Sequence, residues 1–152
     1  MIFSNKKDFR IALKTSEDFF SPIAAGIRSC VRKIQPIVKT FHYISKSSTE
    51  TEILGYTEVI KIVADRVYDD AANNMLFSFA EFTGTDCKSE IFIYDKNDES
   101  SDFGTFTGRR YPVSIAVTKI AADESGKTDL YGFEADIYIN SEGTIETRAI
   151  LE

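Results

Sequence analysis

The sequence is poor in the residues that carry most catalytic and metal chemistry. Its 152 residues include one histidine, two cysteines and no tryptophan. A Ser/His/Asp or Cys/His mechanism would have to use His42, which lies in an aromatic and β-branched segment where a structural role is the simpler interpretation. A zinc site needs about four nitrogen or sulfur ligands, and His42, Cys30 and Cys87 do not supply them. We therefore assign no catalytic residue, no metal ligand and no cofactor, we favour a non-enzymatic role, and we leave a role for His42 open.

Cysteines and long apolar runs are also scarce. Two cysteines are fewer than a small secreted domain usually carries. No segment approaches the roughly 18 apolar residues that a membrane span needs, and the first residues lack the apolar core of a signal peptide. These features predict a cytoplasmic protein with free thiols and no membrane partner. The sequence alone does not decide whether Cys30 and Cys87 form a disulfide.

The charge balance is acidic. There are 18 basic and 24 acidic side chains, which give a net charge of −6. Phosphate backbones repel an acidic surface, so nucleic acid is not expected as a partner, whereas a basic protein surface would be attracted. The length suits one domain over residues 1–152, and a hydrophobic content of 43% excludes a disordered chain.

The N-terminal third predicts a short strand, a helix and a second strand. Apolar residues alternate over 9–13, which favours a strand. Ser21-Pro22 is a typical helix start, and Pro36 would end the helix. Between them, apolar residues recur at helical spacing: Ile23, Ala24, Ile27, Val31 and Ile34. Residues 37–45 are β-branched and aromatic and predict a strand.

The middle of the chain is ambiguous. Residues 57–71 fit a helix slightly better than a strand, and both interpretations stay open. Residues 75–83 and 90–94 predict buried strands. The charged segment 95–102 places oxygen ligands at alternate positions, as a calcium loop does, but Ser100 and Phe106 stand where such a loop needs glycine and glutamate. A solvated loop is the simpler interpretation.

The C-terminal third has the clearest pattern. Apolar and polar residues alternate over 111–117, 131–139 and 145–151, and polar segments with glycine separate them. This pattern predicts consecutive hairpins. The expected fold class is therefore α+β: an antiparallel sheet with a C-terminal three-strand meander, packed on one or two helices.

The predicted meander has an acidic outer face. Glu134, Asp136 and Glu146 alternate with apolar residues, and Asp123 and Glu124 lie in the turn between two of the strands. Hairpin register decides whether these acids form one surface. Arg109 and Arg110 also suit an anionic partner, although an ordinary strand edge is the favoured interpretation.

Two functional hypotheses follow from this chemistry. The first is a non-enzymatic, acidic protein-binding domain, such as an immunity-type inhibitor that neutralises a basic toxin, for example a nuclease, by covering its active site. The acids named above would be its partner-binding residues. The alternative is a small-ligand-binding or enzymatic domain in which a helix and a curved sheet enclose an apolar pocket. A homodimer through an exposed sheet edge is a third option.

Overall fold

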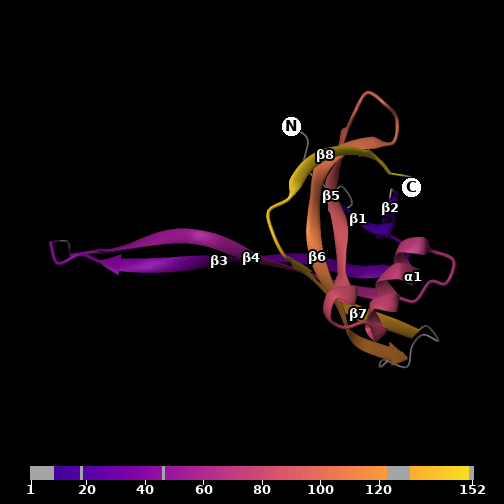
Figure 1. Cartoon of the computed structure of the whole chain (residues 1–152), viewed down its shortest axis with the longest axis horizontal. Coiled ribbons are helices and arrows are strands. Elements are labelled where there is room, and N and C mark those ends of the chain that lie inside the picture. The colour runs from indigo at the N-terminus through magenta and orange to yellow at the C-terminus, as the bar shows by residue number, and fades with distance from the viewer. Residues whose placement is uncertain (1–8, 18, 46, 123–130, 151–152) are drawn as a thin grey trace.

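Eight strands form one antiparallel sheet in the computed structural model, which describes residues 9–17, 19–45, 47–122 and 131–150 (Figure 1). The strands are β1 (Phe9–Ser16), β2 (Phe19–Pro22), β3 (Ile27–His42), β4 (Thr49–Asp65), β5 (Lys88–Glu99), β6 (Thr105–Ala122), β7 (Tyr131–Ile139) and β8 (Thr144–Ala149). The helix α1 (Ala71–Ser78) and two short 3-10 turns, η1 (Phe79–Glu81) and η2 (Gly84–Cys87), connect β4 to β5. The strand order is β2-β1-β5-β6-β7-β4-β3, and β8 pairs with β6.

The long strand β6 divides this sheet into two parts. Its first half pairs with β5 on one side and, over Thr105–Arg110, with β8 on the other. From Val113 onward it pairs with β7. We call β2, β1, β5, the first half of β6 and β8 the curled sheet, and we call the second half of β6 with β7, β4 and β3 the arm sheet.

The strands β1 and β5 of the curled sheet are buried on both faces. In β1, Ile11 and Leu13 belong to the larger hydrophobic cluster, while Ala12 between them belongs to a smaller one. In β5, Ile91 and Phe92 divide in the same way. The larger cluster joins β1 and β5 to α1 and to the inner face of the arm sheet. Each fully buried Ile, Leu or Phe contributes about 1.5–3 kcal/mol through apolar burial.

The helix α1 is capped and anchored at its start. The carboxylate of Asp70 accepts a hydrogen bond from the Asn73 backbone N–H at 2.9 Å. The Asn73 side chain is itself buried, donates to the Asp65 carbonyl at 2.9 Å, and accepts from the Val67 N–H at 3.0 Å. This amide ties the helix to the end of β4 and leaves Leu76 fully buried on the sheet.

A glycine shapes the entry to β3. Gly26 has a φ of +74°, and a Cβ placed there would lie 2.7 Å from the Asp65 carbonyl oxygen. The Asp65 N–H also donates to the Gly26 carbonyl at 2.8 Å. Only glycine combines this backbone conformation with so close an approach.

The predicted α+β fold class is wrong, because strands dominate the described structure and α1 is the one short α-helix in it. Residues 22–34, predicted as a helix, form the last residue of β2, the connection 23–26 and the first half of β3. Their helical spacing has no single face in a strand, where Val31 and Ile34 lie on opposite faces. Pairing with β4 from Ile27 to His42 overrides the local pattern.

Two predictions in the middle of the chain are also wrong. Residues 57–65, favoured as part of a helix, belong to β4, where alternate residues Ile60, Ile62 and Ala64 are buried. Residues 75–83, predicted as a strand, form the second half of α1, the turn η1 and the two residues after it. Their almost continuous apolar run has no clear period, so the pattern did not separate a buried strand from a short buried helix.

The C-terminal strands were located correctly, but their pairing was only partly predicted. β6 and β7 form the expected antiparallel pair. β8 pairs with the first half of β6 instead of following β7 in a three-strand meander. The strands predicted at residues 9–13 and 90–94 are confirmed as parts of β1 and β5.

Candidate assembly surfaces

The hairpin of β3 and β4 projects from the molecule as an arm (Figure 1). The last pair between β4 and β7 joins Glu58 to Ile139, so beyond it β3 and β4 pair only with each other in the described structure. We call residues 35–57 the arm. Its strand from Pro36 to His42 reaches about 23 Å at ~3.3 Å per residue.

The core-facing side of the sheet continues along the arm. Ile60 is fully buried opposite Ile137, and residues of β4 at every second position share that face. Past Glu58 the same face carries an apolar strip, consisting of Pro36, Val38, Ile53 and Tyr56. Pro36 pairs with Tyr56, and a register shift between Ile37 and Val38 then pairs Val38 with Ile53, which keeps Ile53 on this face. The side chains of Val38, Ile53 and Tyr56 are 53%, 57% and 60% exposed. The strip thus has the pattern of a core face but nothing from the described residues of its own chain covers it.

The opposite side of the arm is mixed in character. Lys39 pairs in register with Glu52, and its ammonium nitrogen lies 4.9 Å from the centre of the Phe41 ring. Glu50 pairs with Phe41 in the same register. The arm therefore has one largely apolar face and one face that carries charge.

A charged contact fixes the root of the arm. The Arg32 Nε donates to the Glu58 carboxylate at 2.9 Å, and the Arg32 guanidinium lies 5.6 Å from the centre of the Tyr111 ring. Burial lowers the pKa of Arg32, but hydrogen bonds to Glu58 and Tyr111 outweigh this and raise it. Beside this contact lies an open groove of about 620 Å³ whose lining includes Tyr56, Glu58 and Glu142.

The structure separates the acids that were predicted as one patch. Glu134 and Asp136 lie on the outer face of β7, away from the core, and Asp136 is opposite Lys61 of β4. Glu146 lies on β8, at the other end of β6. Asp123 and Glu124 lie outside the described residues. Among the described acids of this set, only Glu134 and Asp136 are therefore brought together.

Glu146 takes part in a chain of ion pairs that crosses the curled sheet. Its carboxylate lies 2.7 Å from the Arg148 Nε and 3.1 Å from a guanidinium nitrogen of Arg110. Arg110 also contacts Glu90 at 3.1 Å, and Glu90 contacts Lys14 at 3.5 Å. These carboxylates are compensated within the chain, so they do not form a free acidic surface. Sequence reasoning missed this network, because it depends on the pairing of β8 with β6.

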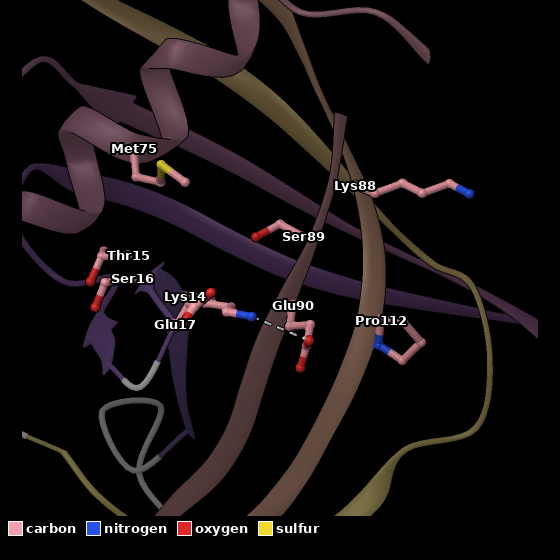
Figure 2. Close-up of a pocket in the computed structure, with 9 residues that line it drawn as sticks. All are labelled: Lys14, Thr15, Ser16, Glu17, Met75, Lys88, Ser89, Glu90 and Pro112. Carbon is pink, nitrogen blue, oxygen red and sulfur yellow. Dashed lines mark ion pairs between the residues drawn. The ribbon is translucent and has the colours of Figure 1, made fainter. Parts of the chain in front are cut away.

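Figure 2 shows the groove at one end of this network. It measures about 480 Å³, lies between the end of β1, Met75 of α1 and the start of β5, and contains the Lys14–Glu90 contact. Lys88 points away from the other labelled side chains (Figure 2). The groove is open and most of its lining residues are polar or charged, unlike the enclosed apolar pocket expected for the ligand-binding alternative.

The remaining candidate residues have structural surroundings. His42 is exposed at the end of β3, opposite Thr49 on the arm. Cys30 and Cys87 are both free, as predicted, and burial raises the pKa of the Cys30 thiol to about 11. The segment 95–102, predicted as a solvated loop, instead continues β5 as far as Glu99. Within it the Asp95 carboxylate accepts from the Asn97 N–H at 2.8 Å, and Glu99 accepts from the Gly104 N–H at 3.0 Å. These carboxylates thus stabilise the local turn.

The described residues contain neither a metal-binding cluster nor a membrane-spanning helix. No group of three or more His, Cys, Asp or Glu side chains is placed to hold a metal ion there. No helix in that part of the chain is long and apolar enough to cross a membrane.

The fold resembles chains of two large assemblies. A chain from the tail of an empty GTA particle, refined with C6 symmetry, superposes with a TM-score of 0.63 at 16% identity, covering 95% of this chain and 99% of that one. A chain from the PVC sheath-tube complex of an extracellular contractile injection system, in its extended state, gives 0.54 at 10% identity, covering 96% and 91%. No protein-family model and no curated protein matches the sequence.

This likeness overturns the functional hypotheses made from the sequence. The immunity-type inhibitor of a basic toxin is wrong, and so is the alternative of a ligand-binding or enzymatic domain, because the similar chains build tail and sheath-tube structures. A basic protein partner loses its support as well. The neighbours are oligomeric assemblies, which agrees with the third option, self-association. The arm was the feature that sequence reasoning missed.

Proposed function

We propose that this protein is a structural subunit that assembles with further copies of itself into the ring or tube of a tail-like particle. The observation that carries the proposal is the apolar strip on the arm. Its residues continue the buried face of the sheet, yet Ile53 and Tyr56 are more than half exposed. Contiguous exposed apolar surface on a soluble chain marks an interaction site. The likeness to chains of tail and sheath-tube assemblies supports a second copy as the partner.

The arm also needs a partner for its own stability. A two-stranded ribbon is marginally stable alone in water, and a third strand or a packed face is required to stabilise it. Docking the strip on a neighbouring copy supplies that packed face. Because β3 and β4 run without interruption from the arm into the body, docking there orients the whole subunit.

The face of the arm is too small to form a stable interface alone. Two strands about 4.8 Å apart over about 23 Å give a face of only about 200–250 Å². A stable interface buries about 800 Å² on each partner. The proposed assembly therefore requires further contacts between the bodies of neighbouring subunits.

The test is the assembly state of the purified full chain, measured by light scattering and negative-stain electron microscopy. The wild type is expected to form rings or tubes as its concentration rises. Ile53→Glu places a charge in the strip and is expected to shift assembly to at least tenfold higher concentration. Gln35→Glu adds the same charge on the opposite face of the arm, and is expected to assemble like the wild type.

Both variants should keep the wild-type circular dichroism spectrum and unfolding midpoint, since residue 53 is solvent-exposed in the single chain. A wild type that stays monomeric at millimolar concentration would contradict the proposed function. If Ile53→Glu and Gln35→Glu assemble equally well, the apolar strip is not a contact between copies.

A further inference from the structure

The turn between β5 and β6 presents a fully exposed aromatic ring. Residues 100–104 form this turn, which projects from the curled sheet at the end away from α1 (Figure 1). Phe103 within it is 98% exposed. Covering such a ring would remove a large apolar area from water and favour binding. A single exposed phenylalanine is common on protein surfaces, so its surroundings decide whether it forms a contact.

The backbone around this ring is fixed by the folded chain. Gly104 has a φ of +77°, which glycine adopts readily. Its N–H donates to the Glu99 carboxylate at 3.0 Å, and its carbonyl accepts from the Ile150 N–H at 2.9 Å. The Ser100 N–H also donates to the Thr105 carbonyl at 2.7 Å. The turn is therefore preorganised, and binding through it costs little backbone entropy.

The turn also carries a negative charge beside the ring. Asp102 precedes Phe103, and its backbone N–H donates to the Ser100 hydroxyl at 3.3 Å. Its carbonyl accepts from the Thr105 N–H at 3.1 Å. Among the described residues, no hydrogen bond or ion pair engages the Asp102 carboxylate. The turn thus offers an aromatic ring and an uncompensated carboxylate next to each other.

A groove of complementary chemistry lies at the root of the arm. It is the open groove beside Glu58, of about 620 Å³, and we call it the root groove. Its lining includes the exposed side chains of Tyr56 and Arg109. The Arg109 guanidinium donates to the Gly143 carbonyl at 3.3 Å, and no carboxylate of the described residues pairs with it. Such an arginine can bind a carboxylate and stack on an aromatic ring.

Two acids share the lining of the root groove. Glu58 accepts from the Arg32 Nε at 2.9 Å, so its charge is compensated within the chain. Glu142 is exposed and would repel a carboxylate that enters the groove. Its removal is therefore expected to strengthen the binding of an acidic turn.

The other grooves lack an available cation of this kind. In three of them a lysine or arginine is already paired with a carboxylate of its own chain: Lys14 at 3.5 Å, Arg28 at 2.9 Å and Arg148 at 2.7 Å. Lys88 borders the first of these grooves but points away from the other labelled side chains (Figure 2). The root groove is therefore the best match for the turn.

The root groove also continues the apolar strip of the arm. Tyr56 belongs to the strip and lines the groove as well. A neighbouring copy that covers the strip therefore also meets the groove. Because the face of the arm is too small for a stable interface, a second contact beside it is needed. The occupant that follows from this continuity is a second copy of this chain.

From these matches we infer that the root groove receives the turn 100–104 of a neighbouring copy. The Phe103 ring packs against Tyr56, and the Asp102 carboxylate pairs with the Arg109 guanidinium. This inference rests on the proposed function and names the contact between bodies that the arm alone lacks. The contact joins two different surfaces, so each added copy leaves a free turn or a free groove for the next.

Exchange of the two charges tests the inference in the full chain. Arg109→Asp and Asp102→Arg are each expected to raise the concentration needed for assembly at least tenfold, measured by light scattering, because each brings like charges together. The double variant is expected to return to within about threefold of the wild type, since the pair is restored in reverse. Glu81→Arg changes an exposed acid on η1 and is the control. Combined with Arg109→Asp, it is expected to restore nothing.

The other two contacts have their own variants. Phe103→Ala is expected to raise the assembly concentration at least tenfold, whereas Phe19→Ala, an exposed ring on β2, is expected to assemble like the wild type. Glu142→Gln removes the repulsion in the groove and is expected to lower the assembly concentration severalfold. All of these side chains are exposed, so every variant should keep the wild-type circular dichroism spectrum and unfolding midpoint.

Two results would overturn the inference and leave the proposed function standing. One is a double charge variant that assembles no better than Arg109→Asp alone. The other is Phe103→Ala that still forms rings or tubes at the wild-type concentration. A wild type that stays monomeric would overturn the inference together with the proposed function.

Discussion

The same two strands have different surroundings in the body and in the arm. In the body, Ile60 and Ile62 of β4 are completely buried in the larger cluster, together with residues of β7, α1 and β1. In the arm, Ile53 and Tyr56 of the same strand follow the same face pattern and are more than half exposed. The difference teaches that apolar residues at alternate positions of a strand indicate which face is to be buried. They do not indicate whether the surface that covers this face belongs to the same chain.

The largest expected effect comes from shortening one buried and one exposed isoleucine. Ile62→Ala leaves a cavity in the larger cluster and is expected to lower the free energy of unfolding by about 2–5 kcal/mol. Ile53→Ala is expected to change it by less than about 0.5 kcal/mol in the monomer, since it removes only exposed surface. Urea unfolding below the assembly concentration measures both. Equal losses of unfolding free energy in the two variants would show that residue 53 is as tightly packed as residue 62, and would contradict the difference between arm and body.

A smaller effect is expected at the body end of the hairpin. Asn73→Ala removes a buried amide that bonds to Asp65 and Val67, and leaves those backbone groups without this partner. We expect a loss of about 2–3 kcal/mol. Asn74→Ala, one residue further on and exposed, is the matched control and is expected to lose less than half as much. Similar losses in both variants would mean that the amide of Asn73 does not anchor the helix to β4.

The smallest expected effect is a pH dependence from Cys30. Burial raises the pKa of this thiol from 9.0 to about 11, so the folded state holds its proton more strongly than the unfolded state does. The resulting stability is fully present below pH 9 and is lost as the pH rises from 9 towards 11. The urea midpoint of the wild type should therefore fall more steeply over pH 8.5–10.5 than that of Cys30→Ala. Parallel curves would place the thiol in water and contradict its burial beside the cluster.

Local patterns predicted the elements whose partners lie close in the sequence. The alternation of Ile11 and Leu13 correctly predicted β1, and the paired alternations on either side of residue 126 correctly predicted the contact between β6 and β7. α1 was missed because Met75, Leu76 and Phe77 are consecutive apolar residues. The one available signal was Asp70, which caps the helix with its carboxylate.

The ion-pair network and the arm could not be predicted in the same way, because both depend on pairing between strands that are far apart in the sequence. The position of Glu146 beside Arg110 follows from the pairing of β8 with β6, which no local period encodes. The segments 37–45 and 52–63 carry enough β-branched residues to predict a hairpin around the polar loop. That the hairpin projects as an arm depends on β7 ending at Ile139.

The continuity of β3 and β4 also has a mechanical consequence. Both strands pass from the arm into the body without interruption, and β4 is bonded to β7 from Glu58 to Asp65. Ladder hydrogen bonds lie perpendicular to the strands, so a pull on the tip along the arm axis loads these bonds in shear, all at once, instead of opening them one after another. The arm is thus a tether that resists tension along its length and yields more easily to peeling from the side.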